Sequence, residues 1–256
     1  MGITRPLQRC SRRRVSWLPE TLLSGHSGAT APVSHRLPRT IALIAGNLSN
    51  GSARSGAPIR ESPQIAASTT RLTLVRHAPS DATRRSAFPL DEPLDERGLD
   101  EARALRPHLG RFDVAWTGPA ARARQTAEAL GLAATPAPEL DECDFGAWRG
   151  RTLAELDDED PVAVAAWIED PAAAPHGGES LLALLERVGA WLDARAGESG
   201  RVVAVTHAGP IRAALVRALG APPEAFWRLD VAPLSRTVLH AHDGRWTVRA
   251  VNLPPS

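Results

Sequence analysis

Residues 71–77, which read Arg-Leu-Thr-Leu-Val-Arg-His, form a short apolar run that ends in a basic pair. A second run of the same kind, residues 201–207 (Arg-Val-Val-Ala-Val-Thr-His), also ends in a histidine. Short apolar runs of this length predict buried strands, and ligands of open α/β sheets bind beyond the carboxyl ends of the strands. We therefore expect His77 and His207 to reach the same edge of one sheet.

The sequence on either side of these runs alternates between helix and strand patterns. Apolar residues at helical spacing predict helices over residues 95–109, 120–130, 179–195 and 210–219. Further short strands are predicted over residues 113–116, 236–241 and 246–251, with Asp243-Gly244 as the hairpin turn between the last two. Such alternation indicates one α/β domain with helices on both faces of a largely parallel sheet.

The first 70 residues differ in character from the rest of the chain. They carry nine arginines against two acidic residues, whereas residues 71–256 carry 21 arginines against 27 acidic residues. Their scattered apolar residues follow neither a helical nor a strand period, so they cannot bury enough apolar area to offset the entropy of ordering. We interpret residues 1–70 as a disordered extension, or as upstream sequence added by a wrongly chosen start codon, and residues 71–256 as the folded domain. The Arg12–Arg14 run leaves a targeting or anion-binding arm as the alternative.

The composition excludes several classes of function. All 30 basic residues are arginine, so mechanisms that need a Schiff-base or P-loop lysine are excluded. The mildly acidic body lacks the basic surface of a nucleic-acid binder, and no apolar run approaches the ~20 residues of a membrane helix. The two cysteines lie in unlike regions, which favours a reducing compartment without disulfides. We expect a cytoplasmic protein that binds neither nucleic acid nor membrane.

Five blocks of sequence resemble the histidine phosphatase superfamily, also called the phosphoglycerate mutase-like family. In chain order they are residues 74–80 (LVRHAPS), 117–127 (TGPAARARQTA), 140–146 (LDECDFG), 177–180 (GGES) and 206–212 (THAGPIR). The first resembles the Arg-His-Gly signature of the family, and the last resembles its second-histidine block. The resemblance spans residues 71 to about 215. It implies a three-layer sandwich with a mostly parallel central sheet and helices on both faces.

The resemblance also implies a role for each matched residue. His77 is the expected nucleophile, while Arg76, Arg122 and His207 hold the phosphate oxygens. Glu142 is the expected acid, which protonates the leaving alcohol and later activates water. The chemistry of these residue types agrees, because arginine presents forked donors that suit phosphate. A neutral imidazole is a competent nucleophile when a backbone carbonyl holds its other nitrogen.

Ser80, Thr83 and Ala208 complete the set of expected phosphate contacts. The Ser80 hydroxyl matches the family pattern, and a turn-forming role is its alternative. Thr83 stands where many mutases of the family carry Asn. Ala78 stands where the family usually has Gly, which predicts an ordinary negative φ at this position.

Other polar residues receive plainer interpretations. His240 and His242 share a strand face without a third ligand, so we expect no metal ion and no cofactor. His108 and His176 are interpreted as surface residues. The acidic run at residues 157–160 is interpreted as the solvated start of a helix, where acidic side chains complement the helix dipole.

These observations favour a phosphomonoesterase that acts on a small phosphorylated metabolite as a monomer or homodimer. A mutase must retain its intermediate with extra cationic groups, yet the chain has no lysine and only 186 residues from Arg71 onward. The alternatives are phosphoryl transfer of the mutase type and, because fold alone never proves activity, a non-catalytic phospho-ligand sensor. Small members of the family act on alpha-ribazole 5′-phosphate and on sugar or nucleotide phosphates. We expect residues 88–93 and 149–176 to select among them.

Overall fold

The structure of the chain is a computed structural model that describes residues 69–255. The interpretation of residues 1–70 as an extension therefore falls outside the described residues, except at its last two positions. Thr69 and Thr70 open the first strand, β1 (Thr69–Arg76), which begins two residues before the predicted start of the domain.

Six strands form a single sheet in the order β3-β2-β4-β1-β5-β6. The neighbours β3 and β2, β2 and β4, and β4 and β1 pair in parallel, while β5 pairs antiparallel with both β1 and β6. The strands after β1 are β2 (Val114–Thr117), β3 (Thr135–Pro136), β4 (Gly200–Thr206), β5 (Arg236–His242) and β6 (Arg245–Leu253). The predicted mostly parallel sheet is therefore confirmed.

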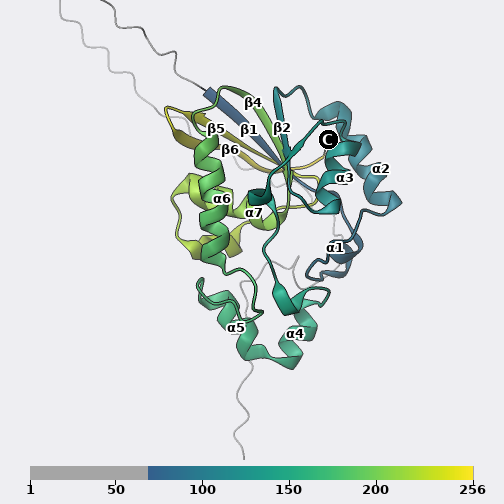
Figure 1. Cartoon of the computed structure of the whole chain (residues 1–256), viewed down its shortest axis with the longest axis vertical. Helices are drawn as coiled ribbons and strands as arrows, with labels where there is room; N and C mark the ends of the chain where they lie inside the picture. Colours follow the sequence, from purple (N-terminus) through teal and green to yellow (C-terminus); the bar gives the residue numbers. More distant parts are fainter. Residues whose placement is uncertain (1–68, 256) are drawn as a thin grey trace, which may run out of the picture. The chain divides into compact units, whose positions relative to one another are not determined.

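Helices cover both faces of this sheet (Figure 1). The helices α2 and α3 pack on one face and α6 and α7 on the other, while α4 and α5 lie together apart from them. The helices are α1 (Asp81–Arg85), α2 (Glu96–Leu105), α3 (Ala121–Ala129), α4 (Leu153–Glu159), α5 (Pro161–Glu169), α6 (Leu181–Arg195) and α7 (Ala208–Leu219). Within residues 69–255, no helix is long and apolar enough to span a membrane.

The middles of the central strands β1 and β4 are mostly apolar because both of their faces are buried. In β1, Leu72 and Leu74 belong to the core beneath α6 and α7, whereas Val75 belongs to the core beneath α2 and α3. In β4, Val202 and Val203 divide between the two cores in the same way. Successive side chains of a strand point to opposite faces, so a continuous apolar run is what a sheet covered on both sides requires.

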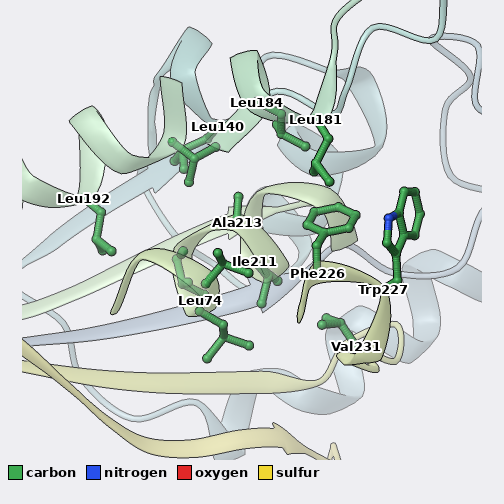
Figure 2. Close-up of a cluster of buried hydrophobic side chains, with 14 of the residues drawn as sticks. Leu74, Leu140, Leu181, Leu184, Leu192, Ile211, Ala213, Phe226, Trp227 and Val231 are labelled. Atoms are coloured by element: carbon green, nitrogen blue, oxygen red, sulfur yellow. The ribbon is translucent and has the colours of Figure 1, made fainter. Parts of the chain in front are cut away.

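Helix α6 presents the apolar stripe that its sequence predicts. Leu181, Leu184, Val188 and Leu192 are all buried, and the Ser180 hydroxyl caps the helix by accepting a hydrogen bond from the backbone of Ala183. Figure 2 shows the α6 leucines facing Ile211 of α7 across one core. This face of α6 is therefore a main attachment of the helical layer to the sheet.

The acidic run at residues 157–160 does not begin a helix as predicted. Residues up to Glu159 form the last turn of α4, and only Asp160 stands at a helix start, where it caps α5. The reason lies upstream, where Thr152 and Glu155 form a capping box that starts α4 early. Pro161 then opens α5, at a position where proline is well tolerated.

The helix predicted over residues 95–109 also ends early. Its α-helical part stops at Leu105, and residues 106–108 continue as a 3₁₀ turn. Pro107 has no backbone N–H to donate to the preceding turn, so it disfavours continuation of the α-helix.

Two leucines of α6 test the contribution of its buried stripe. Leu192→Ala, at a fully buried side chain, should lower the free energy of unfolding by about 2–5 kcal/mol because it leaves a cavity. Leu182→Ala makes the same chemical change at a side chain that is 44% exposed, and it should change that free energy by less than about 1 kcal/mol. Urea denaturation followed by circular dichroism measures both, and equal losses would contradict the orientation of α6.

Candidate active site

His77 and His207 lie side by side because the two strands that precede them are paired in register. Arg76 of β1 is opposite Thr206 of β4, and the backbone N–H of His77 donates to the carbonyl of Thr206 at 2.8 Å. The two imidazole centroids are 4.9 Å apart with the rings edge to face. Both side chains are buried. The expectation that the two histidines reach one edge of the sheet is confirmed.

One nitrogen of the His77 ring is held by the backbone. Nδ1 lies 2.7 Å from the carbonyl oxygen of Ala78, and because a carbonyl only accepts, Nδ1 carries the proton and Nε2 keeps its lone pair. Burial, followed by the charges of Arg76 and Arg122, holds the pKa of His77 well below its ordinary value. The ring is therefore neutral near pH 7, with Nε2 available as a nucleophile.

Two arginines stand beside this ring with donors to spare. Arg76 donates through one terminal nitrogen to the carbonyl of Val231 at 2.6 Å, and Arg122 donates in the same way to the carbonyl of Leu90 at 2.8 Å. Burial, with the nearby Arg212 as the next cause, lowers the pKa of Arg76 to about 10. Among the described residues, neither Nε atom has a hydrogen-bond partner. Each guanidinium is thus anchored at one end and keeps a buried donor for an anion.

The hydroxyl of Thr126 ties Arg122 to the His77 loop. It donates to the carbonyl of Arg122 at 2.7 Å and accepts from the backbone N–H of Ala78 at 3.0 Å. Thr126 is fully buried, so these contacts are shielded from water. These two hydrogen bonds therefore fix the position of helix α3 relative to the loop after β1.

His207 is the residue at the N-cap position of α7, where its side chain makes no capping hydrogen bond, and it is completely buried. Neither of its ring nitrogens has a hydrogen-bond partner within residues 69–255, and Nε2 lies 3.6 Å from a carboxylate oxygen of Asp141. Burial, followed by the neighbouring His77 and Arg122, holds the pKa of His207 well below its ordinary value. Burial in turn raises the pKa of Asp141.

The Glu142 carboxylate lies at the amino end of α7, next to His207 in sequence, although Glu142 belongs to a different segment of the chain. One carboxylate oxygen accepts from the backbone N–H of Gly209 at 3.4 Å, and the other accepts from the N–H of Cys143 at 3.0 Å. A Cβ atom at position 209 would lie 2.1 Å from this carboxylate. Glycine is therefore needed at position 209 for Glu142 to approach the first turn of α7.

Ser80 and Thr83 are engaged with each other in the first turn of α1. The Ser80 hydroxyl accepts from the backbone of Thr83, lies 3.2 Å from the Thr83 hydroxyl and donates to Glu92. The turn-forming role that the sequence allowed for Ser80 is thus the one that these contacts describe. Ala208, half-buried, is the first residue of α7 and lies next to His207.

A cavity of about 420 Å³ opens between Arg122 and Glu142. The residues that line it also include Asp91, Asp144 and Arg149, with Leu90 as an apolar contact. Two of these residues, Leu90 and Asp91, come from the loop predicted to select the substrate, and Arg149 begins the other predicted segment. The cavity is large enough for a leaving group of a few heavy atoms beyond the phosphate.

Several neighbours of this site have roles that sequence reasoning missed. Arg212 belongs to the quoted 206–212 block and donates to the carbonyl of Leu229 at 2.8 Å. Glu92 lies between Ser80 and Arg122, with a carboxylate oxygen 4.0 Å from an Arg122 nitrogen. Arg187, on α6, contacts the segment that carries Glu142. It lies 45 residues from Glu142 in sequence, so no local pattern relates the two.

The interpretation of His176 as a surface residue is wrong. Its side chain is buried among Phe145 and Trp148, and Nδ1 accepts from the backbone N–H of Gly178 at 3.0 Å. Its burial lowers the pKa of the ring. No group of three or more potential metal ligands is arranged to bind an ion in the part of the chain that the structure describes.

Buried donors that converge on a nucleophilic imidazole suit the three equatorial oxygens of a phosphoryl group. Together with their place beyond the carboxyl ends of parallel strands, they define an α/β protein that handles phosphate esters. Residues 72–254 match the sequence model of the Histidine phosphatase superfamily (branch 1). The chain belongs to this family, as its motifs implied, and is a phosphatase.

The alignments with similar proteins extend over nearly all of the domain that the structure describes. Phosphoserine phosphatase 1 of Hydrogenobacter thermophilus is 31% identical over 194 residues, which span 72% of this chain and 92% of that protein. The adenosylcobalamin/alpha-ribazole phosphatase of Escherichia coli is 29% identical over 194 residues, or 71% and 95% of the two chains. The solved structure of mycobacterial glucosyl-3-phosphoglycerate phosphatase aligns with a TM-score of 0.65 at 28% identity, covering 73% of this chain and all of that one.

The lowered pKa values of the two histidines predict an acid-sensitive fold. Below the ordinary pKa of 6.5, the unfolded chain binds protons on these imidazoles that the folded chain does not, so the free energy of unfolding falls as the pH falls. His207→Gln should reduce the slope of this free energy against pH by up to about 1.4 kcal/mol per pH unit. Urea titrations between pH 5 and 7.5 measure the slope, and an unchanged slope would contradict the buried neutral state of His207.

Proposed function

We propose that the protein hydrolyses a small phosphate monoester through a phosphohistidine intermediate on His77. The observation that carries this proposal is the state of the His77 ring, whose Nδ1 is held by Ala78 while Nε2 is free. The unpartnered donors of Arg76, Arg122 and His207 surround this nucleophile. The names of the similar proteins, which are phosphatases of small molecules, support the hydrolysis of a phosphate ester.

In the first step, Nε2 of His77 attacks phosphorus in line as the bond to the leaving oxygen breaks. The protonated carboxyl of Glu142 gives its proton to that oxygen, so the product leaves as a neutral alcohol. Arg76, Arg122 and His207 stabilise the charge on the equatorial oxygens, a form of electrostatic catalysis that needs no covalent contribution from them. Ser80, Thr83 and the amino end of α7 at Ala208 are proposed as outer contacts of the same phosphate.

In the second step, the Glu142 carboxylate takes a proton from water as the water attacks phosphorus. The bond between phosphorus and Nε2 of His77 breaks, and inorganic phosphate leaves. Glu142 is then protonated again and His77 neutral, so the site is ready for the next substrate. One carboxyl group can serve both steps because the leaving alcohol and the attacking water occupy the same side of the phosphoryl group.

The substrate is proposed to be a small, polar phosphorylated metabolite. The cavity of about 420 Å³ is lined by four acidic side chains and by Arg122 and Arg149, which suits a leaving group with hydroxyl or charged substituents. The names of similar proteins provide the first candidates, namely phosphoserine, alpha-ribazole phosphate and glucosyl-3-phosphoglycerate. Values of kcat/KM for these esters, and for sugar and nucleotide phosphates, rank them directly.

We further propose that the enzyme works in the cytoplasm. Cys143 is a free thiol, and burial raises its pKa, which makes it unreactive. Free thiols of this kind fit a reducing compartment.

Replacement of the nucleophile tests the mechanism. His77→Ala should abolish turnover and also the acid-labile, base-stable label that a phosphate donor leaves on the protein. His207→Ala should slow turnover by about 10²–10³-fold, as expected for loss of a buried oxyanion donor, without moving the label. The matched control is His108→Ala, at an exposed histidine, and this variant should keep both the turnover and the label. A label that persists in His77→Ala would refute the assignment.

A second variant tests the proposed acid. Glu142→Gln keeps the shape of the side chain and removes the proton, so it should slow esters with alkoxide leaving groups by about 10²–10⁴-fold. Activated aryl esters should be affected far less in the first step, because a phenolate leaves without a proton. Steady-state and burst kinetics on alkyl and aryl phosphates measure the difference. Equal losses on both would indicate a positioning role and would turn attention to Asp141 or Asp144.

A further inference from the structure

The segment that carries Glu142 has no regular secondary structure of its own. Residues 138–140 form a single 3₁₀ turn, and residues 141–145 are neither helix nor strand. One anchor comes from β4, where the Thr206 hydroxyl donates to the carbonyl of Leu140 at 2.5 Å. The Leu140 side chain is buried in the same core as Leu184 of α6 (Figure 2). These contacts fix the segment before Glu142 but not Glu142 itself.

A second anchor comes from Arg187 on α6. One of its terminal nitrogens donates to the carbonyls of Glu139 at 2.8 Å and Asp141 at 3.2 Å. The other terminal nitrogen lies 3.5 Å from the carbonyl of Glu142. The guanidinium group therefore contacts backbone carbonyls just before the proposed acid and the carbonyl of the acid residue itself.

The same guanidinium is held by a carboxylate. Nε of Arg187 donates to one oxygen of Glu179 at 2.8 Å, and a terminal nitrogen donates to the other at 2.7 Å. Both side chains are mostly buried, at 24% and 16% exposed, so solvent screens this pair less than a surface pair. The thiol of Cys143, next to Glu142, also contacts the backbone carbonyl of Glu179 at 3.3 Å. The loop before α6 and the segment of the acid are thus joined through Arg187.

The planar fork of arginine is what allows this double contact. The bidentate pair with Glu179 uses Nε and one terminal nitrogen of Arg187. The remaining N–H groups can then donate to backbone carbonyls of residues 139–142, the segment that carries the acid. Lysine would offer a single ammonium, which can pair with Glu179 but cannot reach several fixed carbonyls at once.

We propose that Arg187, held by Glu179, is a positioning residue that sets the place of the Glu142 carboxyl opposite the leaving oxygen. The proposal rests on the proposed function, since it acts through the general acid. A misplacement of about 1 Å is enough to cost a reacting group about 10²-fold in rate. Loss of Arg187 should therefore resemble loss of the acid itself, although Arg187 contacts the backbone of Glu142 and not its carboxyl group.

The test is a double-mutant cycle between Arg187→Met and Glu142→Gln, assayed with an alkyl phosphate and with p-nitrophenyl phosphate. Arg187→Met should lower kcat for the alkyl ester by about 10–10²-fold and for the aryl ester much less. In the Glu142→Gln background, the same change should add little further loss, because residues that act as a unit are not additive. Thermal unfolding checks that each variant is folded, and Arg187→Lys, which keeps the charge, replaces Arg187→Met if the latter does not fold.

The matched control is Arg217→Met. Arg217 on α7 makes a bidentate pair with Asp193 of α6, but it is exposed and touches no residue of the acid segment, so its loss should spare both esters. Equal losses on the two esters in Arg187→Met, or a loss that multiplies with that of Glu142→Gln, would overturn the positioning role alone. A Glu142→Gln variant without leaving-group selectivity would instead overturn the acid assignment, and the role of Arg187 with it.

Discussion

The site depends on one constraint, the parallel register of β1 and β4. Pairing of Arg76 with Thr206 brings two histidines to neighbouring positions at the end of adjacent strands, which are about 4.8 Å apart in any sheet. A slip of one residue would turn every side chain of a strand to the opposite face. The fully buried Val75 and Val205 oppose such a slip, so packing of the core on both faces is also what aligns the imidazoles.

Burial shapes the chemistry of these groups as much as their positions do. Neutral imidazoles and arginines with unpartnered nitrogens are costly in a protein interior, and here several lie within one site. An anion that accepts from these donors offsets that cost, so the domain should be more stable with a phosphate-like ligand bound than without one. The part of the structure that costs stability is therefore the part that we propose binds the phosphate of the substrate.

The sequence predicted the main helices, the histidine pair and every strand of the sheet except the two-residue β3 (Thr135–Pro136), because each of these predictions rests on a local pattern. His77 and His207 follow apolar runs, and the α6 stripe repeats at helical spacing. The features that were missed depend on distant partners or on a single overlooked signal. Arg187 contacts Glu142 only because the fold brings them together. His176 is buried against Phe145 and Trp148, with its ring nitrogen bonded to the backbone of Gly178. The early start of α4 could have been predicted from the sequence, since Thr152 and Glu155 have the spacing of a capping box.

The anchoring of Arg76 and Arg122 to the carbonyls of Val231 and Leu90 has a thermodynamic consequence. A free arginine side chain has about 2 kcal/mol of rotamer entropy to lose when it is immobilised. Both guanidinium groups are already immobilised by backbone that belongs to the protein itself, so this loss is incurred when the chain folds and not at each turnover. If these arginines hold the phosphate as proposed, the substrate meets a rigid binding site, and affinity for phosphate comes from preorganisation more than from rearrangement of the protein.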